Sequence, residues 1–152
     1  MNVGGEGDPV DATHRIESGE YRRAAEFRLA LRRFIAHSDK AARRARLTPQ
    51  RYVLMLAVKG MPRSDEQVTM TQLADWLELA PSTVTELVDR AEAAGLVQRL
   101  KGTDGRFVSV RLTEEGERRL DSAFLAIRRE RDELLHQFEH TRRRFNDSTG
   151  GG

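Results

Sequence analysis

A short run of hydroxyl and carboxyl side chains at residues 82–86 has the chemistry needed to read a nucleic-acid duplex. Ser82, Thr83, Thr85 and Glu86 fall at the start of a predicted helix. In a helix-turn-helix, the first residues of the second helix face the base edges of the major groove. Serine and threonine hydroxyls bond to phosphates or bases, and a glutamate carboxylate accepts from the amino group of cytosine. The alternative is that Ser82 and Thr83 only cap the helix, since both residue types favour that position.

The basic side chains suited to phosphate lie at the end of the same helix and beyond it. Arg106 follows a glycine-containing turn at the tip of a predicted hairpin, and Asp104 can hold its guanidinium by a charge-assisted bond. A guanidinium at such a tip fits the negative potential of a narrow minor groove, whereas the alternative is an ordinary exposed turn. Arg90 can reach a phosphate or pair with Glu86, four residues earlier. Further candidates for phosphate contacts are Thr71 and Gln72 at a helix N-terminus, and Arg99 and Lys101 on the hairpin.

Two short helices and a hairpin are needed to position these side chains. Apolar residues recur at helical spacing in 73–77 and in 84–91, and Leu79-Ala80-Pro81 is a tight connection between them. Residues 107–112 alternate in polarity after a glycine-containing turn, which indicates a two-stranded wing. Val68-Thr69-Met70 can add a short third strand. The pattern predicts a winged helix-turn-helix.

Long amphipathic helices flank this unit. Residues 20–46 place apolar side chains at spacings of three and four, which predicts a helix on the order of 40 Å long. Thr48-Pro49 begins a shorter helix that runs to residue 58, and Thr113 caps another long one. This last helix carries a heptad-like apolar seam with one arginine in it, formed by Leu120, Phe124, Ile127, Arg131, Leu134 and Phe138.

The predicted organisation is mainly α with a small β wing. The two apolar seams of the long helices cannot both be buried on one small module, so a second copy of the chain is expected to cover them. The segments are a flexible arm at 1–18, a dimerisation helix at 19–47, the winged helix-turn-helix at 48–112, a second dimerisation helix at 113–139 and a flexible tail at 140–152.

These motifs together resemble the MarR family of bacterial transcriptional regulators. The resemblance is carried by Ser82-Thr83-Val84-Thr85, Val88-Asp89-Arg90, Glu92, Gly95-Leu96-Val97, Arg99, Asp104, Arg106, Val110, Leu112-Thr113 and Gly116. Its core covers residues 71–116, and the flanking helices extend it to about 20–135. The family pattern has another apolar helix where this sequence predicts a tail, which is the main departure.

The resemblance implies a homodimer that binds a palindromic operator in double-stranded DNA, as a repressor rather than an activator. It also implies a small apolar or aromatic acid-like effector, bound between the dimer region and the winged helix, that changes the spacing of the two recognition helices and releases DNA. Candidate lining residues for the effector are Phe34, His37, Tyr52, Met55 and Met61.

Charge and composition narrow the function further. The 152 residues carry a formal net charge of +2, and 48–112 holds eight basic and eight acidic residues, so any basic footprint must come from arrangement. This neutral surface and Glu86 leave open an alternative, a winged-helix module that binds another protein and DNA only weakly. The absence of cysteine excludes disulfides and thiol-based sensing. No signal peptide or membrane-spanning run is apparent, so a cytoplasmic protein is expected.

Metal and enzyme chemistry are not indicated by the sequence. His136 and His140 lie four residues apart beside Glu139, a spacing that can present two ligands to zinc, but a third ligand is not identifiable and solvated side chains are expected. His37 lies near an apolar stripe and is expected to be packed or to line a ligand site. No nucleophile, paired-carboxylate or phosphate-loop constellation is present, so no cofactor and no enzymatic activity are predicted.

Overall fold

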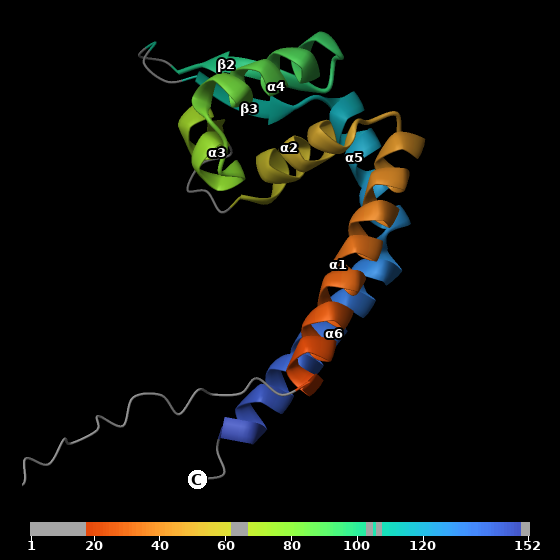
Figure 1. The fold of residues 1–152 in the computed structure, drawn as a ribbon. Coiled ribbons are helices and arrows are strands. Elements are labelled where there is room, and N and C mark those ends of the chain that lie inside the picture. The colour runs from red at the N-terminus through yellow and green to blue at the C-terminus, as the bar shows by residue number, and fades with distance from the viewer. Residues whose placement is uncertain (1–17, 62–66, 103–104, 106–107, 150–152) are drawn as a thin grey trace, which may run out of the picture.

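The chain is elongated, with a small mixed α/β module at one end of a rod of long helices (Figure 1). The computed structural model describes residues 18–61, 67–102, 105 and 108–149. The elements are α1 (Ser18–Arg44), α2 (Pro49–Gly60), β1 (Val68–Thr69), α3 (Met70–Leu77), α4 (Pro81–Ala93), β2 (Val97–Lys101), β3 (Val108–Leu112), α5 (Glu114–Ala126) and α6 (Arg128–Thr149). We refer to residues 48–112 as the winged module and to α1, α5 and α6 as the rod.

The wing is a three-stranded antiparallel sheet in the order β1-β3-β2. Val110 lies at its centre, opposite Val68 of β1 and Arg99 of β2. The predicted hairpin and the short third strand are therefore confirmed.

Helix ends in the winged module follow from local capping chemistry. The hydroxyl of Thr48 accepts from the N–H of Arg51 at 3.2 Å, which begins α2 as predicted. Thr69 and Gln72 form a capping box at the start of α3. Gly95 follows α4 at φ 70°, a left-handed conformation that glycine adopts without steric cost, and it turns the chain into β2.

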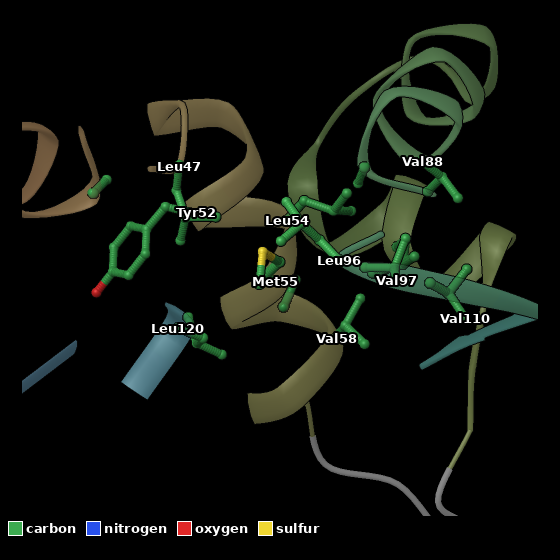
Figure 2. Packing of buried hydrophobic residues seen from close by; sticks show 14 of the residues in the cluster. Leu47, Tyr52, Leu54, Met55, Val58, Val88, Leu96, Val97, Val110 and Leu120 are labelled. Atoms are coloured by element: carbon green, nitrogen blue, oxygen red, sulfur yellow. The ribbon is translucent and has the colours of Figure 1, made fainter. Parts of the chain in front are cut away.

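The core of the winged module gathers apolar side chains from every element around α2 (Figure 2). Leu54 and Met55 of α2, Leu73 of α3, Val88 of α4 and Leu96 before β2 are fully buried. Full burial of a side chain of this size contributes about 1.5 to 3 kcal/mol each. The same cluster continues into the rod through Ala42 of α1 and Leu120 of α5, so the winged module and the rod share one core.

The rod is formed by α1 packed along α5 and α6 (Figure 1). Ala41 and Ala42 are buried at the end of α1 near the winged module, where small side chains let the helices approach closely. Farther along, the rings of Phe27 and Phe138 meet edge to face with centroids 4.7 Å apart. In the part of the chain that the structure describes, no helix is both long and apolar enough to cross a membrane.

The sequence predicts one helix after the wing, ending at 139, and this prediction is wrong in two respects. The helix is interrupted at Ile127, which has φ −110° and ψ 13° and is 3% exposed. Residues 140–149, predicted as a tail, continue α6 to Thr149. Extending an existing helix needs no new nucleus, so a polar segment without an apolar stripe can remain helical. Residues 1–17 of the predicted arm and 150–152 lie outside the described residues.

Thr113 and Gly116 join α5 tightly to the end of α4. The hydroxyl of Thr113 accepts from the N–H of Gly116 at 3.0 Å, the predicted cap, and donates to the carbonyl of Gly95 at 2.6 Å. The N–H of Thr113 donates to the carbonyl of Leu96 at 3.0 Å. A Cβ on Gly116 would lie 2.0 Å from that same carbonyl oxygen, so this helix position requires glycine.

Candidate nucleic-acid interface

The N-terminus of α4 is exposed and has no side-chain cap. The N-cap residue is Ala80, which offers no side-chain acceptor, and Pro81 occupies the first helical position. Ser82 and Thr83 follow it with exposed side chains, so neither residue is the N-cap of the helix. The first N–H groups of a helix have no partner within it, and a helix N-terminus favours anions. Amides and hydroxyls are therefore presented together at one exposed end.

The buried side of α4 fixes which residues face outward. Val84 and Val88 are fully buried in the core of the winged module. With about 100° of rotation per residue, Ser82, Glu86 and Arg90 fall on the opposite side of the helix. The predicted base-reading residues thus share the exposed face of α4.

Two members of this face already have intrahelical partners. The hydroxyl of Thr85 donates to the carbonyl of Pro81 at 2.9 Å, which leaves its oxygen lone pairs and its methyl group for other contacts. Glu86 pairs with Arg90 at 3.2 Å, and each side chain is 66% exposed. Exposed ion pairs of this kind contribute less than about 1 kcal/mol, so either partner can exchange the other for a DNA group.

Arg99 is the main departure from the predicted basic footprint. Its guanidinium lies 2.6 Å from Asp89 and 2.7 Å from Glu92, both on α4, and its side chain is 24% exposed. It also donates to the carbonyl of Thr85 at 3.4 Å, while its own backbone N–H donates to Glu92 at 2.9 Å. Arg99 is therefore a clamp that fastens β2 to the recognition helix.

The electrostatics of this clamp agree with its geometry. The backbone N–H of Arg99, followed by its guanidinium, donates to the carboxylate of Glu92 and holds the pKa of Glu92 below its ordinary value. A depressed carboxyl pKa means that the pair is fully charged at neutral pH. A phosphate contact by Arg99 would have to compete with two carboxylates.

The rest of the wing is only partly described. Lys101 is exposed at the end of β2, in agreement with a position in the basic footprint. Arg111 is also exposed, and its guanidinium donates across the strands to Gln98 at 3.0 Å. Asp104 and Arg106 lie outside the described residues, so the minor-groove contact stays a prediction.

At the start of α3, the two candidate residues differ in their availability. The side-chain oxygen of Gln72 accepts from the backbone N–H of Thr69 at 2.9 Å and from its hydroxyl at 3.2 Å. Thr71 is exposed. Of the two, Thr71 is the freer to meet a phosphate.

The effector candidates do not form one lining. Met55 is fully buried in the core of the winged module, His37 is exposed on α1, and Met61 packs on the edge of the core. Tyr52 is buried, and among the described residues its hydroxyl has no hydrogen-bond partner. Figure 2 shows this hydroxyl pointing away from Leu54 and Met55. Burial raises the pKa of Tyr52, opposed by the positive charge of Arg131.

Arg131, noted in the sequence as the one charge in an apolar seam, lies close to this region. Its guanidinium sits 3.8 Å from the ring centroid of Phe124, a cation–π contact, and donates to the carbonyl of the same residue at 3.4 Å. Phe34 is half-buried on α1. A cation and an unpaired hydroxyl are thus placed where α2 meets the rod.

Both histidines of the weak metal motif are exposed on α6. Across the described residues, no group of three or more histidine, cysteine, aspartate or glutamate side chains is arranged to hold a metal ion.

The functional partners that sequence reasoning missed are Asp89 and Glu92. Both are acidic residues on α4 that enter the family resemblance and the neutral charge balance, but the sequence predicted no partner for either. Their spacing of three places them on neighbouring positions of one helix side. An arginine in the middle of the following strand is the signal that could have identified the clamp.

A helix-turn-helix whose second helix is exposed at its N-terminus, followed by a three-stranded wing, defines a winged helix-turn-helix protein. Residues 47–106 match the family model described as the MarR family. Together with the fold, this match supports a winged-helix transcriptional regulator of the MarR family.

Solved structures of MarR proteins share the fold over nearly their whole length. AbsC, a MarR family transcriptional regulator from Streptomyces coelicolor, is 19% identical with a TM-score of 0.68, covering 92% of this chain and 100% of that one. A MarR family regulator from Rhodococcus sp. RHA1 is 21% identical with a TM-score of 0.64, covering 83% and 93%. A mutant of MarR from E. coli complexed with operator DNA is 14% identical with a TM-score of 0.62, covering 84% and 95%. A comparison with curated proteins gave no match.

Proposed function

We propose that this protein is a DNA-binding repressor that binds a palindromic operator as a homodimer and responds to a small ligand. The observation that carries the proposal is the exposed, uncapped N-terminus of α4, with Ser82, Thr83 and Glu86 on its outward face. A mutant of MarR from E. coli, which has the same fold, was crystallised in complex with operator DNA, and this supports DNA binding by the present chain. A regulatory rather than an enzymatic role agrees with the family.

A homodimer is supported by large apolar side chains that the rod leaves exposed. Leu125 is 59% exposed, and Ile35 and Leu135 are each 55% exposed. The seam residues Leu120 and Ile127 are buried within the chain itself, so they are not the dimer contact that the sequence suggested. Burying the exposed residues against a second copy would bring two recognition helices into one complex, as a palindromic operator requires.

A ligand response is supported by the unpaired hydroxyl of Tyr52. A buried hydroxyl without a partner costs about 1 to 3 kcal/mol, which a ligand could recover by supplying a hydrogen bond. Arg131 offers a positive charge nearby, and Phe124 an aromatic surface. These features fit an aromatic acid, in agreement with the effector class that the family resemblance implies.

DNA recognition is tested by selecting bound duplexes from a random library and measuring affinity against salt concentration. Ser82→Ala and Glu86→Gln should change which base pairs are preferred, because both residues lie on the outward face of α4. Ser122→Ala, an exposed serine on α5, is the matched control and should select the same sequences as the natural protein.

Selection of no duplex, with weak binding at all salt concentrations, would favour the alternative of a protein-interaction module. A uniform loss of affinity for all sequences would reduce Ser82 and Glu86 to phosphate contacts.

The ligand response is tested with Tyr52→Phe, which removes only the unpaired hydroxyl. Without ligand, this variant should be as stable as the natural protein or slightly more so. Benzoate, as a simple aromatic acid, should release operator DNA from the natural protein at lower concentration than from the variant. Identical benzoate responses in the two proteins would rule out Tyr52 as a ligand contact.

A further inference from the structure

Cations outnumber acidic side chains on α1. The 27 residues of α1 include eight lysines and arginines and three acidic residues, which leaves a net charge of +5. The winged module, by contrast, is formally neutral, with eight basic and eight acidic residues in 48–112. The excess positive charge of the protein is therefore on the rod and not on the helix that reads DNA.

Helix geometry gathers part of this charge into one stripe. With about 100° per residue, four cations fall within about 40° of one another and outside the sector that packs on α5 and α6, with Glu26 as the one acidic residue in the same 40°. All four side chains are exposed, and no acidic side chain of the described residues pairs with them. They are Arg22, Arg33, Lys40 and Arg44, which we call the α1 stripe.

The length of the α1 stripe suits a DNA duplex. From Arg22 to Arg44 the helix rises about 33 Å at about 1.5 Å per residue. One turn of B-DNA is about 34 Å long, so the stripe can follow phosphates across one groove. Three of its four residues are arginines, whose planar guanidinium binds phosphate oxygens through two parallel hydrogen bonds.

The α1 stripe is less suited to an anionic membrane than to DNA. The apolar side of α1, including Phe27 and Phe34, is already turned toward the rod. Leu29 is the one large apolar residue beside the α1 stripe, and it is 47% exposed. A helix that lies in a membrane interface needs a continuous apolar face to insert.

We propose that the α1 stripe binds the phosphate backbone of a DNA duplex without base specificity, and that this duplex is distinct from the one read by α4. Figure 1 shows α1 running away from α4 and the wing along the rod. One molecule can then hold two separate DNA segments. This activity goes beyond the proposed recognition of an operator, which it neither requires nor replaces.

The experiment compares two triple variants with equal loss of charge. The test variant is Arg33→Gln, Lys40→Gln and Arg44→Gln in α1. The control variant is Arg118→Gln, Arg128→Gln and Arg129→Gln, which removes three exposed cations from α5 and α6. Fluorescence anisotropy measures binding of each protein to a non-palindromic duplex over a range of salt concentrations.

The test variant should bind the duplex more weakly and lower the slope of log K against log salt by about 2 to 3, since each neutralised phosphate contributes about 0.9. The control variant should keep the natural slope. A bead carrying one duplex should recruit a second, labelled duplex through the natural protein and the control variant, but not through the test variant.

Three results would overturn the proposal. Equal losses in both variants would show that net charge alone matters. Binding of phosphatidylserine vesicles that depends on the α1 stripe, with duplex binding unchanged, would assign the stripe to lipid. A test variant that sediments as a monomer while the control is a dimer would make the stripe a subunit interface. Ser82→Ala should leave the slope of log K against log salt unchanged. A failure of operator recognition by α4 can therefore be distinguished from a failure of DNA binding by the α1 stripe.

Discussion

The winged module pairs two of its arginines with acidic side chains of α4, whereas the described part of the rod leaves a stripe of cations unpaired; both regions expose some large apolar side chains, among them Trp76 of the winged module at 52%. In the winged module, Arg90 is tied to Glu86, and Arg99 to Asp89 and Glu92. In the rod, the α1 stripe has no acidic partner among the described residues, and Leu125 and Leu135 are more than half exposed. The contrast in charge indicates that a stripe of cations available to other molecules lies on the rod.

The largest effect is expected at the junction of the two regions. Gly116→Ala would place a Cβ 2.0 Å from the carbonyl oxygen of Leu96. Because the contact is with backbone, relief requires α5 to move, and we expect a loss of about 3 kcal/mol or more in the free energy of unfolding. Chemical denaturation measures this loss.

The matched control for the junction is Gly60→Ala. Its added Cβ would meet nothing within 4 Å, so stability should be unchanged or slightly higher. Equal stability of the Gly116 and Gly60 variants would show that α5 and the winged module are not tightly joined.

A second prediction tests whether the rod needs a partner. Leu125→Asp with Leu135→Asp should leave the helix content unchanged, since both side chains are exposed, but should give monomers in sedimentation. Loss of two-site engagement should then weaken operator binding by about 100-fold or more.

Val53→Asp is the control for the rod, because Val53 is a 47% exposed apolar residue on α2 of the winged module. Its variant should remain a dimer. If the leucine double variant also remains a dimer, the dimer contact lies elsewhere on the rod. Ile127 is not a useful probe, because its side chain is buried within the chain and its replacement would disturb the fold.

A third and smaller effect separates the two ion-pair sites of α4. Arg99→Gln should cost about 1 kcal/mol of stability, because the guanidinium is half-buried and holds two carboxylates. Arg90→Gln should cost about 0.3 to 0.5 kcal/mol, the usual contribution of an exposed pair four residues apart. Thermal denaturation of both variants checks the order, and equal losses would contradict the clamp.

The smallest expected effect is a decrease in the free energy of unfolding at low pH. The pKa of Glu92 is lowered by its hydrogen bonds from Arg99, and Arg118 and then Arg119 lower the pKa of Glu115 to about 2. A carboxyl with a lowered folded-state pKa stabilises the fold above its unfolded value of about 4.3 and loses this contribution as the pH falls. Stability should therefore decrease between about pH 5 and pH 2.

The contribution of the Arg99–Glu92 pair to this pH dependence can be separated from that of the other carboxyls in the same measurement. Arg99→Gln should flatten the upper part of the pH curve in part only, because Glu92 loses the guanidinium but keeps the hydrogen bond from the backbone N–H of residue 99, the larger cause of its lowered pKa. Parallel curves for this variant and the natural protein would show that Glu92 gains nothing from the guanidinium of Arg99.

The winged module was predictable because each of its parts carries a local signal. Thr48 and Thr113 are capping residues, a proline opens α4, and polarity alternates along β3. The interruption at Ile127 has no such signal, since neither proline nor glycine is present and the apolar seam continues through it. The role of Arg99 was also missed, because a charge count over 48–112 does not show which charges meet.

The short contacts around Thr113 also bear on how a movement of α5 is passed to α4. The Thr113 hydroxyl holds Gly95 and Gly116 at once, and its N–H holds Leu96. Because these bonds join the end of α4 to the start of α5, we expect a rotation of α5 to turn α4 in the same step. Hydrogen exchange of the backbone amides of Gly95 and Gly116 should then report the same rate constant for opening.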